Sequence, residues 1–208
     1  MQQMKVGWDA THGEFLIDDH YYFSKLRSIA EAEGIQIETV GSFSRLEKYD
    51  IIVFNYPEIR FKIREISRIR GWLRKGKTVV FASYYNNLDN VTFIINSVLK
   101  RLDSELRINN DVIVDEEFNR NDPMLPLALW KSERVLMPCS SSVSGGEAVI
   151  VGNNTSRSTR GFKAVFASCE HVNGGEIVVM GTCVFWDNYS INEFSNRELA
   201  LAVLSGKI

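Results

Sequence analysis

The first hundred residues alternate short apolar runs with stretches of helical hydrophobic periodicity. The apolar runs cover residues 4–10, 35–40, 49–57 and 77–85. Apolar side chains recur at helical spacing after the first, third and fourth of these runs. This alternation is the signature of β-α-β units, whose strands pair in parallel. The unbroken run at 49–57 is typical of a strand that is buried on both faces of such a sheet.

Three further apolar runs, at residues 147–153, 162–169 and 175–183, lie in the second half of the chain. The Gly174-Gly175 pair between the last two runs is a tight-turn signal. It predicts an antiparallel β hairpin near the C-terminus.

A closing helix is predicted to begin near Ser195, where Glu198 stands at the spacing of a capping box. The sequence does not determine the arrangement of residues 104–173, which include two of these three further apolar runs. The chain shows no internal repeat and no linker, and its length suits one sizeable core. We therefore expect a single α/β domain over residues 1–208.

Four stretches of sequence resemble the class I glutamine amidotransferase-like superfamily, in particular its non-catalytic branch of unknown function. They are "VGWDATHGE", "YDIIVFNYPE", "IRGWLRKGKTVVFASYYN" and "GEIVVMGTCVFWDN", the last followed by the helical "SNRELALAVL". The resemblance implies a flavodoxin-like three-layer α/β sandwich with a mostly parallel sheet and the antiparallel hairpin near the C-terminus.

The cysteine nucleophile that the resemblance implies is absent from the turn after the run at 77–85. Ser83 is the nearest hydroxyl, and Tyr84 and Tyr85 crowd a position where a nucleophile needs small neighbours. Amidotransferase chemistry is therefore not expected. Whether another reaction is catalysed stays open, and the balance favours a protein that is not an enzyme.

Ligands of open parallel sheets bind outside the carboxyl ends of the strands. Residues 9–14, 55–58, 83–87 and 181–188 follow predicted strands and are rich in polar and aromatic side chains. The predicted ligand-binding residues are Asp9, Thr11, His12, Glu14, Asn55, Tyr56, Ser83, Tyr84, Tyr85, Asn86 and Trp186. Aromatic faces with amides suit sugars and nucleobases. The first hypothesis is a non-catalytic domain that binds a small sugar- or nucleotide-like ligand, or a protein partner, at this edge.

A first alternative is a hydrolase that acts on a carbohydrate or an amide through Asp9, His12 and Glu14, with or without a metal ion. A carboxylate beside an imidazole can serve as general base. Asp9 is equally suited to bracing its own loop. The spacing of these residues fits no recognised metal signature, and the sequence therefore predicts no metal and no cofactor.

A second alternative is nucleic-acid binding through the basic helix at 60–77. This segment holds eight Lys and Arg residues against the single acid Glu65. The net charge of −2 and the lack of aromatics interleaved with these bases argue against nucleic acid. An acidic partner, or a second copy of the chain, is the stronger expectation, because an acidic segment is also present. That segment contains Asp111, Asp115, Glu116, Glu117 and Asp122.

The three cysteines, Cys139, Cys169 and Cys183, are widely spaced and odd in number. They fit neither a disulfide framework nor a metal knuckle, which favours a reducing compartment. No apolar run reaches the length of a membrane span, and the N-terminus lacks the layout of a secretory signal. The sequence therefore predicts a cytoplasmic protein without membrane contact.

Overall fold

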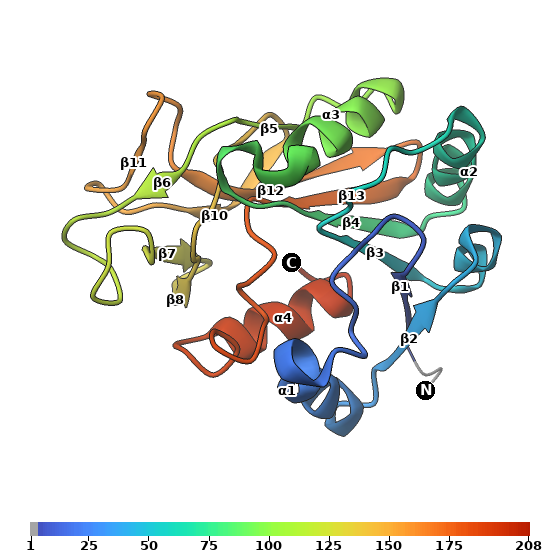
Figure 1. Ribbon diagram of the computed structural model, residues 1–208, viewed down its shortest axis with the longest axis horizontal. Coiled ribbons are helices and arrows are strands. Elements are labelled where there is room, and N and C mark those ends of the chain that lie inside the picture. The colour runs from blue at the N-terminus through green and yellow to red at the C-terminus, as the bar shows by residue number, and fades with distance from the viewer. Residues whose placement is uncertain (1–3) are drawn as a thin grey trace.

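A nine-stranded mixed sheet forms the centre of the computed structural model, which describes residues 4–208 (Figure 1). Its strand order is β2-β1-β3-β4-β13-β12-β10-β7-β8. The first five strands in this order pair in parallel: β2 (Gln36–Val40), β1 (Lys5–Asp9), β3 (Ile51–Asn55), β4 (Thr78–Ala82) and β13 (Gly175–Met180). The other four add antiparallel pairs: β12 (Val165–Val172), β10 (Glu147–Val151), β7 (Leu127–Trp130) and β8 (Glu133–Leu136).

Two small sheets extend the antiparallel half. They pair β11 (Arg157–Ser158) with β6 (Ile113–Val114) and β5 (Arg107–Ile108) with β9 (Val143–Ser144). The helices are α1 (His20–Ala32), α2 (Ile63–Arg74), α3 (Val91–Arg101) and α4 (Asn196–Leu204), with 3-10 segments η1 (Phe43–Lys48) and η2 (Tyr85–Asn90). In Figure 1, α1 and α4 lie together on one side of the sheet, and α2 and α3 lie on the other. Within residues 4–208, no helix has both the length and the apolar character that a membrane crossing requires.

The predicted flavodoxin-like sandwich with a mostly parallel sheet is wrong. β13 closes the parallel half by pairing with β4, and β12 then runs antiparallel to β13. The Gly174-Gly175 hairpin is confirmed, with Gly174 in the left-handed region at φ 97°. Antiparallel neighbours need only short turns, whereas each further parallel strand needs a crossover of a dozen or more residues. Residues 104–173 contain short strands and no helix, so they extend the sheet by antiparallel pairing.

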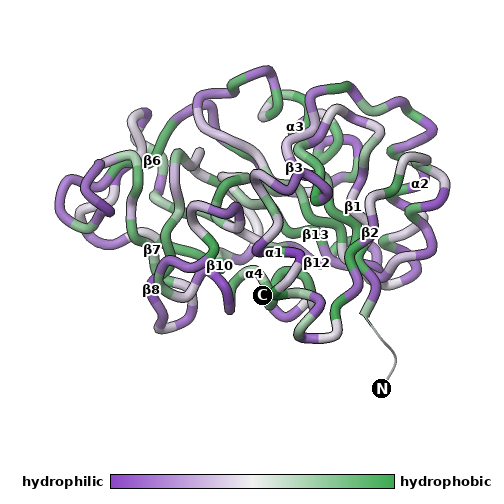
Figure 2. The backbone as a smooth tube through the Cα atoms, turned by 60° about the horizontal axis from the view of Figure 1, so that its bottom comes forward, coloured by the Kyte–Doolittle hydropathy of each residue, from purple (hydrophilic) through white to green (hydrophobic). Residues whose placement is uncertain are grey.

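Large aromatic side chains fill the space between the parallel strands and the helices. Trp8 and Trp186 lie with their ring centroids 5.1 Å apart, and Phe54 stacks on Phe81 at the same separation. All four are less than 2 % exposed. The backbone in Figure 2 is hydrophobic along β3 and β13 and hydrophilic at many outer turns. This core holds the carboxyl ends of the parallel strands in fixed positions.

Candidate functional site

The loops that follow the parallel strands meet at one edge of the sheet and are joined there by backbone hydrogen bonds. Phe15 N donates to Asn55 O at 3.2 Å, and Tyr56 N donates to Ala82 O at 2.9 Å. Ser83 N donates to Met180 O at 2.9 Å. Because β1, β3, β4 and β13 are consecutive and parallel in the sheet, their carboxyl ends share this edge, as the sequence predicts.

A cavity of about 270 Å³, which we call the aromatic cleft, opens at this edge. Phe15 stacks on Tyr56 with ring centroids 5.0 Å apart, and Tyr84 meets Tyr56 edge-on at 6.1 Å. Phe15 is 40 % exposed, so part of its ring is accessible to a ligand. The lining residues are Phe15, Tyr22, Phe23, Tyr56, Tyr84, Leu88, Asp89, Cys183, Val184 and Asp187.

Two aspartates supply the acidic groups of the aromatic cleft. Asp89 accepts a hydrogen bond of 2.7 Å from the Tyr56 hydroxyl. Asp187 is 5 % exposed, accepts hydrogen bonds from the backbone of Tyr189 and Ser190, and has its pKa raised by burial. Within the described chain, no Lys or Arg is among the residues that line the cleft. The charged groups of the cleft are therefore carboxylates, which carry negative charge and accept hydrogen bonds.

The backbone of Phe15 is held from both sides. Its carbonyl oxygen accepts hydrogen bonds from Trp8 Nε1 at 2.9 Å and from Asn55 Nδ2 at 3.2 Å. Asn55 Oδ1 in turn accepts from Trp186 Nε1 at 3.3 Å. Asn55 and Trp186 are both 0 % exposed. These two predicted ligand-binding residues thus brace the cleft wall from inside the core.

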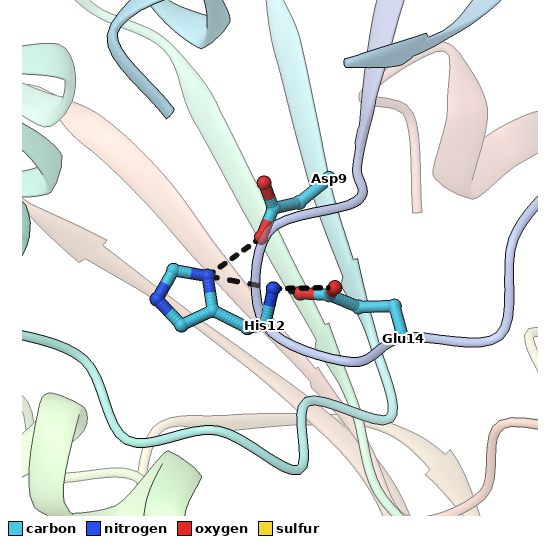
Figure 3. Close-up of side chains that lie close together, drawn as sticks. All are labelled: Asp9, His12 and Glu14. Carbon is cyan, nitrogen blue, oxygen red and sulfur yellow. Dashed lines mark hydrogen bonds and ion pairs between the residues drawn. The ribbon is translucent and has the colours of Figure 1, made fainter. Parts of the chain in front are cut away.

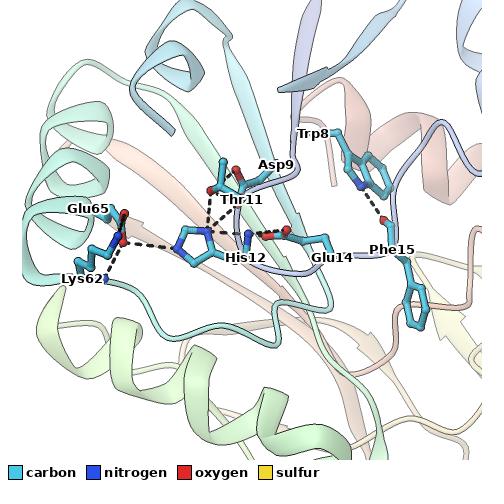
Figure 4. Close-up of polar contacts among 8 residues, drawn as sticks. All are labelled: Trp8, Asp9, Thr11, His12, Glu14, Phe15, Lys62 and Glu65. Atoms are coloured by element: carbon cyan, nitrogen blue, oxygen red, sulfur yellow. Dashed lines mark hydrogen bonds and ion pairs between the residues drawn. The ribbon is translucent and has the colours of Figure 1, made fainter. Parts of the chain in front are cut away.

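A second group of polar residues, the Asp9 cluster, lies at the end of β1 and in the loop directly after it, and comprises Asp9, Thr11, His12 and Glu14. Figure 3 draws Asp9, His12 and Glu14, and Figure 4 adds Thr11. His12 Nδ1 lies 2.7 Å from Asp9 Oδ2 and 3.9 Å from Glu14 Oε1. Thr11 Oγ1 lies 2.9 Å from both Asp9 Oδ1 and His12 Nδ1. Asp9, His12 and Glu14 are 0 %, 2 % and 7 % exposed. The three titratable side chains therefore lie together in the interior, shielded from solvent.

The two oxygens of the Glu14 carboxyl differ in their surroundings. Oε2 accepts a 2.8 Å hydrogen bond from the backbone N–H of His12. Oε1 is buried and has no hydrogen-bond partner among residues 4–208. Burial, followed by the neighbouring Asp9 carboxylate, raises the pKa of Glu14 to about 9.

Residues near the start of α2 enclose the imidazole of His12 from its other side (Figure 4). His12 Nε2 lies 3.5 Å from Glu65 Oε2, which also accepts a 2.6 Å hydrogen bond from Lys62 N. The Phe61 ring stacks on the imidazole with a centroid distance of 3.8 Å and an interplanar angle of 11°. The ring of His12 is thus fixed in position and in orientation.

The sequence-predicted site residues divide between these two places. Tyr56 and Tyr84 line the aromatic cleft, whereas Asp9, Thr11, His12 and Glu14 form the Asp9 cluster and do not line it. Asp9 and His12 lie within hydrogen-bond reach, as the hydrolase hypothesis requires. Their near-complete burial separates them from a substrate in the cleft.

Three predicted residues lie outside both places. Ser83 is fully buried, with its hydroxyl 3.1 Å from that of Thr92. Tyr85 packs edge-on against Tyr84, and Asn86 is exposed with a φ of 51°. Sequence patterns did not indicate several of the residues that line the cleft. These are Phe15, Tyr22, Phe23, Leu88, Asp89, Cys183, Val184 and Asp187.

The basic segment at 60–77 and the acidic segment at 111–122 do not form two fully exposed surfaces of opposite charge. On and beside α2, Arg70 pairs with Asp103 at 2.8 Å, and Lys77 Nζ donates to Tyr49 O at 2.6 Å. In the acidic segment, Asp111 and Asp115 are 0 % exposed, so they cannot belong to an acidic surface. Self-association through these charges stays a prediction, with fewer acidic groups to support it.

By sequence, the chain is similar to one family model and to a bacterial protein. Residues 23–204 match the family described as "Domain of unknown function (DUF4350)". A protein of Aquifex aeolicus (strain VF5), named "Uncharacterized protein", is 36% identical over 221 residues, which cover 97% of this chain and 93% of the relative.

Three solved structures share the fold at low sequence identity. The "mmIFT52 N-terminal domain" has a TM-score of 0.81 at 14% identity and covers 98% of this chain and 96% of its own. The polyextremophilic β-galactosidase of Halorubrum lacusprofundi has a TM-score of 0.58 at 12% identity, covering 99% of this chain and 30% of the enzyme. The cytoplasmic protein STM1381 of Salmonella typhimurium LT2 has a TM-score of 0.52 at 10% identity and covers 98% and 99% of the two chains.

These comparisons correct the predicted membership of the class I glutamine amidotransferase-like superfamily. The sequence match is to a different family, and none of the structural neighbours reported above is named as an amidotransferase. The quoted motifs consist of apolar strands followed by polar turns, a pattern that many sheets with parallel strands produce. They therefore identified the parallel half of the sheet and misidentified the family.

Proposed function

The chain belongs to the DUF4350 family, and we propose that it is a non-catalytic binding domain whose aromatic cleft takes a small, uncharged, ring-shaped ligand of the sugar class. The observation that carries this proposal is the meeting of separate loops around one cavity. Phe15, Tyr56 and Tyr84 come from three different loops and form neighbouring walls of it. Aromatic walls with a few convergent polar groups are the usual makeup of a small-molecule site.

The size of the cavity suits a single ring. At about 270 Å³, it lies at the lower end of the range for ligand pockets. A neighbouring groove of about 380 Å³ shares Tyr84, Val184 and Asp187 with it, which leaves room for a ligand that extends beyond one ring.

The charges of the cleft favour an uncharged ligand over a nucleotide. Sugar hydroxyls can donate hydrogen bonds to Asp89 and Asp187, and carboxylates are the stronger class of acceptor. A phosphate would meet these two carboxylates without a lining base to compensate its charge. The cleft therefore supports the sugar-like half of the sequence prediction over the nucleotide-like half.

The reactive groups near the cleft are poorly suited to catalysis. Cys183 lines the cleft, but burial raises the pKa of its thiol, which suppresses the nucleophilic thiolate. The Asp9 cluster is buried apart from the cleft. The β-galactosidase similarity concerns fold alone and under a third of that enzyme, so the choice of a sugar rests on the cleft itself.

Replacing Phe15 by Ala is expected to weaken sugar binding about tenfold, because loss of an aromatic face removes roughly 1.4 kcal/mol. The assay is saturation-transfer difference NMR on the full chain with a fixed panel of neutral methyl glycosides, and with AMP as the phosphate-bearing comparison. At least one glycoside should bind, and AMP should bind more weakly.

Phe162→Ala is the matched control, because Phe162 is 45 % exposed and does not line the cleft. It should leave glycoside binding unchanged. Tighter binding of AMP than of every glycoside would contradict the proposal, as would equal glycoside binding by the Phe15→Ala and Phe162→Ala variants.

A further inference from the structure

We propose that Asp9, His12 and Glu14 bind a divalent first-row metal ion, with Zn²⁺ as the preferred ion, beneath the loop that follows β1. This site is separate from the aromatic cleft, and the proposal does not depend on whether the cleft binds a sugar. The spacing of these residues along the chain fits no known metal signature, so the sequence alone predicts no metal here.

The three donor atoms already converge on a common point. One atom from each side chain can be chosen so that all three lie within 4.8 Å of one another. A tetrahedral zinc site places its ligand atoms about 3.3 Å apart, as follows from metal–ligand distances near 2.0 Å. The distances from His12 Nδ1 to Asp9 Oδ2 and to Glu14 Oε1, 2.7 Å and 3.9 Å, fall on either side of that value.

A second observation, independent of the distances, is that one carboxyl oxygen of Glu14 has no hydrogen-bond partner in the described chain. The side chain is completely buried, and the oxygen without a partner within residues 4–208 is Oε1. Figure 3 shows the carboxyl group directed toward His12. A buried oxygen without a hydrogen-bond partner is costly, and buried charges in proteins are normally paired or bound to a metal. A divalent cation at the convergence point would give this oxygen its missing partner and offset the charge of Asp9.

The surroundings of His12 present Nδ1 as the ligand atom. Metal-binding histidines usually direct their other ring N–H toward a carboxylate or a carbonyl group. Here Nε2 faces Glu65 Oε2 at 3.5 Å, so Glu65 can accept the Nε2 proton when a metal ion takes the place of the proton between Nδ1 and Asp9 Oδ2, which lie 2.7 Å apart. The stacked ring of Phe61 holds the imidazole in this orientation. Glu65 is itself fixed by its hydrogen bond from Lys62 N.

The donor types select the class of ion. One imidazole with two carboxylates suits Zn²⁺ and, less strongly, Mn²⁺. Mg²⁺ and Ca²⁺ prefer sites made only of oxygen ligands. The hydroxyl of Thr11, 2.9 Å from His12 Nδ1, is close enough to act as a fourth ligand or to hold a bound water.

The ion would have a structural role. Asp9 ends β1, and Glu14 directly precedes Phe15, so the proposed ligands span the loop that carries one wall of the aromatic cleft. Binding to the folded chain alone stabilises it by mass action. At a free Zn²⁺ concentration 100-fold above Kd, the thermal midpoint should rise by about 5–10 °C.

The first test uses the wild-type full chain, treated with a chelator and then titrated with ZnCl₂ and, in parallel, with MnCl₂. Calorimetry should give one equivalent of Zn²⁺ bound. Long-range ¹H–¹⁵N spectra should show the ring nitrogens of His12 shifting on Zn²⁺ addition, while those of His20 and His171 stay in place. These two exposed histidines are internal controls, since the chain has three in all.

The second test uses Glu14→Gln, which should weaken Zn²⁺ binding at least 100-fold, with Glu31→Gln on the exposed face of α1 as its matched control. If Glu14→Gln fails to fold, the wild-type titration decides alone. Absence of Zn²⁺ and Mn²⁺ binding by the wild-type chain would overturn the proposal. A shift of His20 or His171 in place of His12 would also overturn it.

Discussion

Replacing Asn196 by Ala is expected to destabilise the protein by about 4 kcal/mol, since each buried backbone group left without a partner costs about 1–3 kcal/mol. Asn196 is 0 % exposed and makes three hydrogen bonds to backbone groups. Its Oδ1 accepts from Leu136 N at 2.7 Å, and its Nδ2 donates to Leu136 O at 2.8 Å and to Phe185 O at 2.7 Å. One side chain thereby connects α4 to β8 and to the segment before Trp186.

Urea unfolding at pH 7 measures this loss as a lower midpoint. Asn192→Ala, at an exposed position shortly before α4, is the control and should change the free energy of unfolding by less than about 0.5 kcal/mol. A similarly small change for Asn196→Ala would show that the three hydrogen bonds contribute little.

Replacing Asp115 by Asn is expected to cost about 3 kcal/mol at neutral pH, because hydrogen bonds to a charged acceptor are the stronger ones. Asp115 is fully buried and accepts from Thr155 Oγ1 at 2.9 Å, from Ser156 Oγ at 2.6 Å and from Phe118 N at 2.8 Å. An amide NH₂ in place of one carboxylate oxygen would face donors. The change would therefore loosen the loop after β6 from residues 155 and 156.

The cost of Asp115→Asn should depend on pH. Burial by itself would raise the pKa of the Asp115 carboxyl, but the hydrogen bonds it accepts, led by the one from Ser156, outweigh burial and lower that pKa. A carboxyl whose pKa is lower in the folded state stabilises the fold above the unfolded pKa of about 3.9. That stabilisation is lost as the pH falls through the folded pKa.

The free-energy difference between wild type and Asp115→Asn should thus be largest near pH 7 and shrink below about pH 4. Urea unfolding at pH 7 and at pH 3 measures it. Glu117→Gln makes the same chemical change at an exposed position nearby and should show little effect at either pH. A difference that stays constant between the two pH values would contradict the assigned role of the ionised carboxylate.

The two proposals concern the same loop at different depths. Phe15 presents its ring to the aromatic cleft, while the side chains of Asp9 and Glu14 are buried with His12. A fixed wall lowers the conformational cost of binding a ligand. If both proposals hold, removal of Zn²⁺ should weaken glycoside binding without abolishing the fold of the parallel strands.

Local sequence patterns predicted the elements of the parallel half well. The strands β1 to β4, the helices α1 to α3 and the hairpin at Gly174 all follow from apolar periodicity and turn residues. The capping box predicted at Ser195 is wrong. Ser195 makes no side-chain cap bond, and its hydroxyl donates to Glu133 Oε2 at 3.3 Å instead.

The antiparallel half could not be predicted in the same way. Its outer strands are short, as with the two residues of β6 and the four of β7, and β10 carries register shifts against β12. Two to five residues are too few to display a period clearly. The pairing of such strands depends on contacts between distant segments.

Sequence by itself determined where the strands and helices of the first hundred residues lie, because a period of apolar residues is a local property that each segment carries alone. It also determined that polar loops would meet at the carboxyl edge, since parallel strands end on the same side. Tertiary structure alone decided what each polar side chain does there. Because they are buried, Trp186 and Asn55 hydrogen-bond within the core, and Asp115 accepts hydrogen bonds that hold residues 155 and 156. Packing of α2 against the loop after β1 places Glu65 beside His12. The hydrogen-bond partners and the solvent exposure of a side chain are set only when distant segments pack together. These two properties determine the chemistry of a carboxylate or an imidazole.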